Sequence, residues 1–296
     1  MRKITGILLV GAGACSYGVL ATIVKYVYGF GTHTSILNFS QFLIGFIILS
    51  LLSLKEKKSE QKQVSFAKKS ISRLIIYGSS LGLTSIFYYI SIQYIPVSVG
   101  IILLMQTIWM GVILEAILGK TKIERTKLIG GFVVIAGTLL ATNIFKSQIS
   151  LDVKGVSFGI LAAICYTISM YASNSVSLEL SSIQRSKYLV LGGLITIILF
   201  WNIQIIQHFD LAIMLKWGTF LALFGTIIPP LLFTKGMPIT GVGLGSILGA
   251  VEIPVSILSA NIILGERIDI IQWIGVLIIL ISVVIINSKS LKTSTN

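Results

Sequence analysis

The chain has 296 residues, of which 55% are hydrophobic and 11% are charged, and its mean hydropathy is +0.96. Soluble domains carry about 25% charged residues, so the composition excludes an ordinary soluble protein. The net charge of +13 does not indicate a nucleic-acid-binding protein, because Lys and Arg occupy short gaps between apolar runs instead of forming one basic patch.

Ten apolar segments follow one another along the chain, and a helix of about 20 apolar residues crosses a bilayer. The first segment begins like a signal peptide, but it is long enough to span and nine more segments follow it. The sequence therefore predicts an all-α membrane protein with ten transmembrane helices. The ten predicted spans are 4–26, 34–54, 73–93, 97–118, 127–143, 153–174, 186–206, 216–234, 241–263 and 270–287.

The positions of Lys and Arg predict the orientation in the membrane. With the N-terminus placed in the cytoplasm, 18 of the 23 basic residues fall in cytoplasmic gaps and five fall outside. Because cytoplasmic loops carry the excess of basic residues, both termini are predicted to be cytoplasmic. The expected location is the cell membrane, either a plasma membrane or a bacterial inner membrane.

The second half of the sequence repeats the first. Ile117-Leu118-Gly119-Lys120 ends the fourth span and Ile263-Leu264-Gly265-Glu266 ends the ninth, at an offset of 146 residues. The predicted repeats are residues 1–146 and 147–296, each with five spans. An odd number of spans inverts the second repeat relative to the first. Inverted repeats are typical of alternating-access carriers, which bind their substrate near the bilayer midplane.

Two polar side chains are predicted at that midplane. Glu252 lies about 16 Å into the ninth span at 1.5 Å per residue, and Gln106 lies at a similar depth in the fourth. Pro254 cannot donate to the carbonyl of Ala250, and a free carbonyl beside a carboxylate suits a cation, a proton or an ammonium group. Glu252 is therefore either a substrate or proton site, or a glutamate that stabilises the fold by bonding to a neighbouring helix.

Aromatic residues accompany this pair. Trp109 follows Gln106 by three residues and shares its helical face. Tyr17 and Tyr166 occupy matching places in the two repeats, and Tyr88 lies in the third span. These rings are candidates to enclose an aromatic or ammonium substrate, with ordinary helix packing as the alternative.

The second repeat also resembles a known family. Its stretches Ala250-Val251-Glu252-Ile253-Pro254, Leu264-Gly265-Glu266-Arg267 and Trp273-Ile274-Gly275 resemble the drug/metabolite transporter superfamily, EamA type. The first repeat departs from the pattern, with Gln106-Thr107-Ile108 where the family often has Glu-Pro and Lys120 where it usually has Glu.

The resemblance implies export or uptake of amino acids, other metabolites or drugs. It also implies a central cavity lined mainly by spans one, three, four, six, eight and nine. The family often has a lysine at the position of Lys25, which suggests a role in gating or in binding a substrate carboxylate. Asn174 is its counterpart in the sixth span. For both residues, placement at the membrane interface is the alternative.

Several signatures are absent from the sequence, which has no phosphate-binding Walker A loop, HExxH, cysteine cluster or nucleophile elbow. We therefore expect neither an enzyme nor a bound metal or cofactor. The favoured hypothesis is a secondary transporter of small metabolites, namely amino acids or related polar or aromatic compounds, with amines or drugs as further candidates. Its expected partners are a small-molecule substrate, membrane lipid and a coupling proton, and no nucleic acid. The alternatives are a lipid flippase and a membrane scaffold or binding protein that does not transport.

Overall fold

The computed structural model describes residues 2–56, 64–95, 97–119, 125–141, 152–265 and 268–293, and these residues form helices with no strand among them. Within this part of the chain, eight helical segments are long and apolar enough to cross a membrane, and Ile270–Ile286 is a shorter apolar helix. The protein is therefore a multi-pass helical membrane protein. The eight segments lie in α1 (Arg2–Tyr28), α2 (Thr34–Lys55), α3 (Val64–Tyr94), α4 with α5 (Val97–Leu104 and Thr107–Gly119), α7 (Val153–Ser175), α8 (Ser182–Trp201), α10 to α12 (Leu211–Thr240), and α13 with α14 (Val242–Gly249 and Glu252–Leu264).

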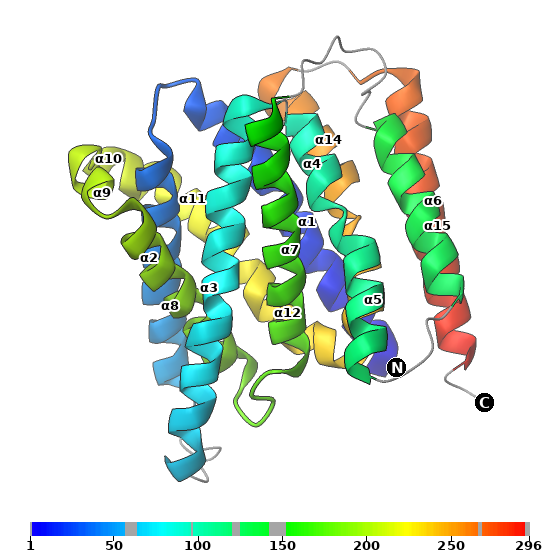
Figure 1. The fold of residues 1–296 in the computed structure, drawn as a ribbon, viewed down its shortest axis with the longest axis horizontal. Coiled ribbons are helices and arrows are strands. Elements are labelled where there is room, and N and C mark those ends of the chain that lie inside the picture. The colour runs from blue at the N-terminus through cyan, green and yellow to red at the C-terminus, as the bar shows by residue number, and fades with distance from the viewer. Residues whose placement is uncertain are drawn as a thin grey trace.

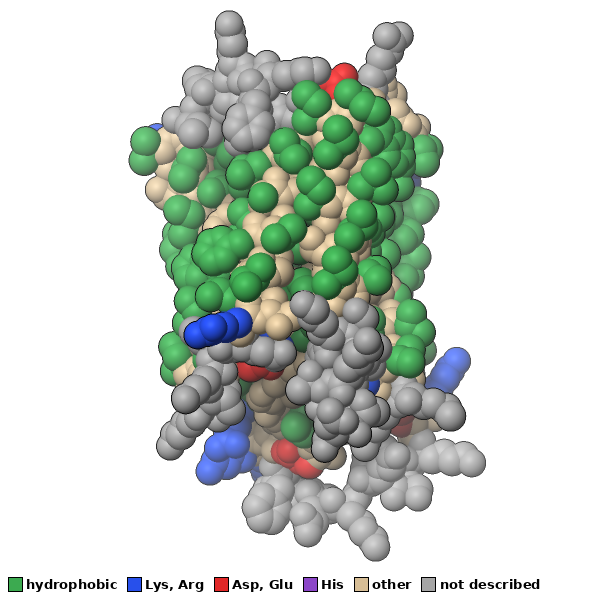
Figure 2. Space-filling view, turned by 90° about the vertical axis from the view of Figure 1, so that its right-hand side faces the viewer, with side chains coloured by type: hydrophobic (Ala, Val, Ile, Leu, Met, Phe, Trp, Pro, Cys, Tyr) green, Lys and Arg blue, Asp and Glu red, His purple; other side chains and the backbone are tan. Residues whose placement is uncertain are grey.

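The two remaining long helices are α6 (Arg125–Ala141) and α15 (Ile270–Thr293), which pack against each other at one side of the bundle. Figure 2 shows that hydrophobic side chains cover this side and that most of the charged side chains in view gather towards its lower end. Phe132 of α6 is 64% exposed and Ile281 of α15 is 55% exposed. Large apolar side chains that point outward in this way suit contact with lipid chains.

Helices from the two halves of the sequence interleave (Figure 1). α1 packs on α12 and α14, α3 packs on α7 and α8, and α6 packs on α15. The buried core therefore lies between the halves rather than within each of them. The predicted repeat boundary, between residues 146 and 147, lies outside the described residues, as do Lys120, Glu266 and Arg267 of the repeated sequence motifs.

Two of the crossing segments are interrupted at corresponding places in the halves. The turn at residues 105–106 separates α4 from α5, and the turn at residues 250–251 separates α13 from α14. At both breaks an N–H, that of Gln106 or Val251, donates to the carbonyl three residues earlier at 3.1 Å. The equivalent turns are 145 residues apart, so the broken helix is itself a repeated feature. The sequence analysis predicted a span at each of these places, 97–118 and 241–263, and did not anticipate the turn within it.

The segment before α12 (Ile228–Thr240) is also irregular. It contains two π-helical stretches, η2 (Met214–Gly218) and η3 (Ala222–Ile227), and α12 then begins with Pro229 and Pro230 in its first turn. Single-turn π-helices often mark functional sites. Here, Gly225 of η3 lines the central cavity described below.

Glycines bring α3 and α8 into backbone contact. A β-carbon added at Gly82 would lie 2.6 Å from the carbonyl oxygen of Gly193, and one added at Gly78 would overlap the backbone of Leu189. Small residues allow helices in membranes to approach closely, and Gly78 and Gly82, four residues apart on one face of α3, have this role here.

We expect Gly78→Ala to destabilise the protein, because the added methyl meets rigid backbone instead of a flexible side chain. Overpacking of this kind costs about 1–3 kcal/mol, which should lower the Tm of the detergent-purified protein by several degrees. Gly11→Ala is the matched control, since a β-carbon at Gly11 would have open space around it. Equal Tm values for the two variants would contradict a close α3–α8 contact.

The two histidines of the sequence meet at the end of the bundle opposite the N-terminus. His33 caps α2 by accepting from the Ser35 N–H at 3.2 Å, and its ring stacks on His208 with the centroids 3.9 Å apart. Trp201 lies edge-on to the His33 ring at 5.7 Å. The pair therefore joins the start of α2 to the residue that follows α9 (Ile203–Gln207).

Burial, and then the charge of the neighbouring His208, hold the pKa of His33 below its ordinary value of 6.5. As the pH falls, the unfolded chain binds this proton first, so the stabilisation is present above about pH 6.5 and is lost below it. We expect acidification from about pH 7.5 to about pH 5.5 to lower the Tm of the wild type more than that of His33→Asn. Asparagine keeps a capping acceptor but has no titrating ring. Parallel curves of Tm against pH for the two proteins would argue against the effect.

Candidate functional site

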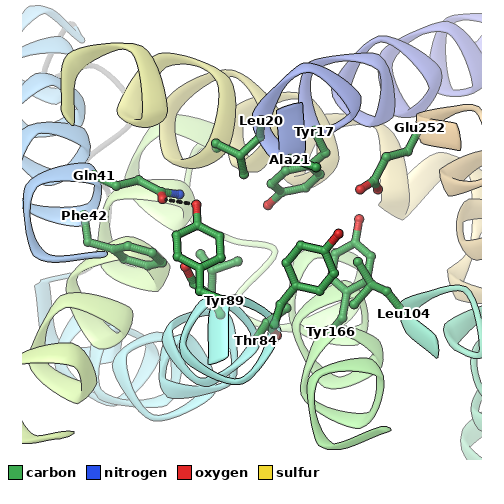
Figure 3. A pocket seen from close by; sticks show the side chains of 14 residues that line it. Tyr17, Leu20, Ala21, Gln41, Phe42, Thr84, Tyr89, Leu104, Tyr166 and Glu252 are labelled. Atoms are coloured by element: carbon green, nitrogen blue, oxygen red, sulfur yellow. Dashed lines mark hydrogen bonds between the residues drawn. The ribbon is translucent and has the colours of Figure 1, made fainter. Parts of the chain in front are cut away.

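A cavity of about 60 Å³ lies at the centre of the bundle, between the two halves (Figure 3). That volume accommodates only a few water molecules. It is bordered by α1, α3 and α4 of the first half and by α7, η3 and α14 of the second, and α2 adds a wall that the resemblance did not imply. The described lining residues are Tyr17, Leu20, Ala21, Gln41, Phe42, Leu81, Thr84, Ser85, Tyr88, Tyr89, Leu104, Tyr166, Gly225 and Glu252.

Glu252 is the acidic group of this cavity, and the break between α13 and α14 places it there. It is the first residue of α14, where the helix N-terminus favours a negative charge. Pro254 follows within the first turn, a position at which its missing N–H costs no helical hydrogen bond. The side chain is 5% exposed, and its Oε2 has no hydrogen-bond partner among the described residues.

The carbonyl of Ala250 is not free, contrary to the expectation from the sequence. Because the chain turns before α14 begins, this carbonyl accepts from the N–H of Ile253 at 3.1 Å. Pro254 thus favours the start of α14 at this place in the chain. Ligand binding in this region would depend on the carboxylate of Glu252 and not on a free carbonyl.

Tyrosines surround the carboxylate. Tyr17, Tyr88 and Tyr166 line the same cavity as Glu252, and Figure 3 shows the carboxylate turned towards tyrosine hydroxyls across the cavity. Tyr17 and Tyr166 meet edge to face with their centroids 5.9 Å apart. The hydroxyls of Tyr88 and Tyr166 are buried without a hydrogen-bond partner among the described residues. The structure therefore brings four of the predicted site residues together.

The opposite end of the cavity is polar but uncharged. Tyr89 donates to the Oε1 of Gln41 at 2.8 Å (Figure 3). Ser85 donates to Asn38 at 2.7 Å, and Thr84 also faces the cavity. The sequence analysis missed this end, because Gln41 sits within an apolar run. A usable signal was present, since Asn38 and Gln41 are three residues apart and thus share a helical face.

Gln106 and Trp109 lie outside the set of residues that line this cavity. Trp109 donates to the Oε1 of Gln106 at 2.8 Å, which confirms the shared face, but Trp109 is 37% exposed. Matching the two helix breaks pairs Glu252 with Thr107 instead of Gln106. Thr107 is buried and bonds to Thr167 of α7 at 2.6 Å, so it joins helices. A binding role for Gln106 and Trp109 stays a prediction.

Lys25 and Asn174 also stand apart from the cavity. Lys25 is exposed in the last turn of α1, and Asn174 lies near the end of α7 with its amide donating to Ser175 at 2.6 Å. Neither lines the cavity, so a role in gating or in binding a substrate stays a prediction for both.

A bundle of apolar helices that encloses a partly polar cavity between two related halves has the build of a membrane transporter. The chain belongs to the EamA-like transporter family, whose sequence pattern matches residues 4–143 and 153–288. It is thus a membrane transporter of small molecules. A solved structure described as "Crystal structure of protein" has the same fold, with a TM-score of 0.74 and 14% sequence identity over 95% of this chain and 96% of that chain. No curated protein matches the sequence significantly.

Proposed function

We propose that the protein is a secondary carrier that moves a small polar or aromatic metabolite through the central cavity by alternating access. The observation that carries this proposal is the buried carboxylate of Glu252, which faces a cavity between the two halves without a hydrogen-bond partner for its Oε2 among the described residues. Ionisable groups at membrane depth are costly, so a side chain left in this state suggests a place for a substrate or ion.

We propose ten membrane spans in two inverted halves with cytoplasmic termini. α6 and α15 supply the two spans beyond the eight long segments, and α1 begins at the same end of the bundle at which α15 ends (Figure 1). The two helix breaks recur 145 residues apart. The excess of basic residues in alternate gaps supports the orientation and placement in a plasma or bacterial inner membrane.

The small cavity corresponds to a closed form of the carrier in this proposal. Glu115 of α5 forms an ion pair with Lys127 at 2.7 Å, and the Glu115 carboxylate lies directly against Gly241 and Gly243 at the start of α13. This contact joins the first half to the second at one end of the bundle. It would have to open when the halves rock and the cavity becomes accessible from that side.

A proton is the coupling ion that suits this site. A carboxylate buried away from cations is costly unless a proton or a bound cation neutralises it. Glu252 would therefore carry a proton when the cavity holds no cation and release it when a cationic group binds. Because a proton and the cationic substrate group would bind to Glu252 in turn, their exchange at this one carboxylate is sufficient to couple proton movement to substrate movement.

The experiment is uptake into proteoliposomes containing the purified protein, with and without an imposed pH gradient. We expect saturable uptake of a small metabolite that the gradient accelerates. Movement of a fluorescent lipid between leaflets in the same vesicles, without metabolite uptake, would favour a flippase instead. Failure of both assays with a folded, monodisperse protein would favour a scaffold that does not transport.

A further inference from the structure

Three unpartnered polar atoms line one end of the cavity. They are the Oε2 of Glu252 and the hydroxyls of Tyr88 and Tyr166, on side chains that are 5%, 7% and 3% exposed. Buried polar groups in folded proteins are almost always hydrogen-bonded, and leaving one unpaired costs about 1–3 kcal/mol. Three such atoms, which come from α3, α7 and α14 and lie at the same end of the cavity, indicate the place where a ligand completes the hydrogen bonding.

The charge of the cavity favours a cation. Glu252 is the one charged side chain among the described lining residues, and these include no Lys, Arg or His. A ligand with a carboxylate would bury an anion in the same cavity as Glu252, with no cationic side chain to pair with it. The lining therefore disfavours α-amino acids and favours an amine without an acidic group.

The number of acceptors narrows the kind of cation. A primary ammonium has three N–H donors and no acceptor, which matches one carboxylate oxygen and two phenolic oxygens. A quaternary ammonium has no N–H and would leave all three oxygens unpaired. The tyrosine rings would attract either cation, so hydrogen bonding is what separates the two.

The rest of the lining defines the body of the ligand. Apolar side chains line much of the cavity: Leu20 lies between the Glu252 end and the Gln41 end, Phe42 lies beside Gln41, and Leu104 lies at the Glu252 end (Figure 3). A flat aromatic or compact apolar group would bury favourably between these walls once the two halves move apart, because the closed cavity of about 60 Å³ is too small to hold it. We propose that the cavity binds a primary amine with an aromatic or apolar body, and that Glu252, Tyr88 and Tyr166 bind its ammonium group. This proposal rests on the proposed carrier function.

The test is binding to the purified wild-type protein, measured as thermal shift and by calorimetry with four probes that share one ring. The probes are phenethylamine, its N,N,N-trimethyl derivative, phenylalanine and 2-phenylethanol. We expect phenethylamine to bind at least about tenfold more tightly than each of the others, because each of them loses N–H donors, adds an unpaired carboxylate or lacks the charge. Equal affinity for the trimethyl derivative, or tighter binding of phenylalanine, would overturn the proposal.

Two variants refine the result. Tyr88→Phe/Tyr166→Phe keeps the rings and removes two acceptors, so we expect it to weaken phenethylamine binding and to leave trimethyl binding unchanged. Glu179→Gln, in the exposed loop between α7 and α8, is the control and should behave as wild type. A preference for the primary amine that survives in the double variant would contradict the assigned contacts.

Binding and transport can fail separately. Binding of phenethylamine in detergent with no uptake into proteoliposomes would support the ligand class and contradict the carrier proposal. Uptake of another metabolite that no amine inhibits would support the carrier and overturn the ligand class.

Discussion

Glu252→Gln is expected to abolish transport while leaving the fold intact. The amide has nearly the shape of the carboxylate, but it can neither pair with a cation nor carry a proton. Loss of one partner of a buried charge pair costs about 2–5 kcal/mol, so substrate affinity should fall about 30-fold or more. In proteoliposomes, an imposed pH gradient should therefore drive no uptake by the variant.

The same variant separates the two interpretations of Glu252 that the sequence left open. Because its Oε2 has no partner among the described residues, the amide should preserve or raise the Tm of the substrate-free protein. A glutamate that held helices together would instead give a Tm several degrees lower. Normal transport by well-folded Glu252→Gln, at a level equal to Glu179→Gln, would remove Glu252 from the mechanism.

Arg185→Met is expected to give the largest loss of stability. Arg185 lies in α8 but is only 3% exposed, and its guanidinium donates to four backbone carbonyls. Three of these carbonyls are at the end of α7 and the fourth is in α12: the bonds run to Ala172 at 3.3 Å, Ser173 at 2.6 Å, Val176 at 3.0 Å and Thr234 at 2.7 Å. A cation at a helix C-terminus satisfies carbonyls that have no partner within the helix, so Arg185 joins three helices.

Hydrogen bonds from charged donors contribute about 1.5–3 kcal/mol each, so loss of the set should cost about 3 kcal/mol or more. The measurement is thermal unfolding in detergent. Lys187→Met is the matched control, because Lys187 is two residues away and partly exposed, and its change should stay within about 0.5 kcal/mol. Arg185→Lys should fall between them, since an ammonium cannot reproduce the planar fork of donors. Equal Tm values for Arg185→Met and Lys187→Met would contradict this role.

The sequence located the site better than it located the individual contacts. Tyr17, Tyr88, Tyr166 and Glu252 all line the cavity, because a carboxylate or hydroxyl group at the middle of a span is costly in contact with lipid and usually faces the protein interior. Gln106 was paired with Glu252 from a motif offset of 146 residues, whereas the backbone breaks are 145 apart. A shift of one residue turns a helical side chain by about 100°, which is enough to place Thr107 at the equivalent position.

Other contacts carried little signal in the sequence. Gln41 and Tyr89 come from different helices, and only the packing of α2 near α3 lets them meet at 2.8 Å. In the sequence, Arg185 is one of many basic residues near a span end, and only the fold places four carbonyls from two other helices around it. Both arrangements depend on how each helix is rotated about its own axis, and hydropathy along the sequence does not predict that rotation.

By itself, the sequence determined the membrane class, the succession of apolar segments and the repeat, because lipid imposes a length and a polarity that can be read from composition alone. The tertiary structure decided which polar groups share a cavity. It did so by breaking two helices at matching points and by turning Glu252 inward among the tyrosines. The helix breaks and the orientation of Glu252 are stabilised by packing between helices that are distant in the chain, and a local sequence pattern does not contain this information.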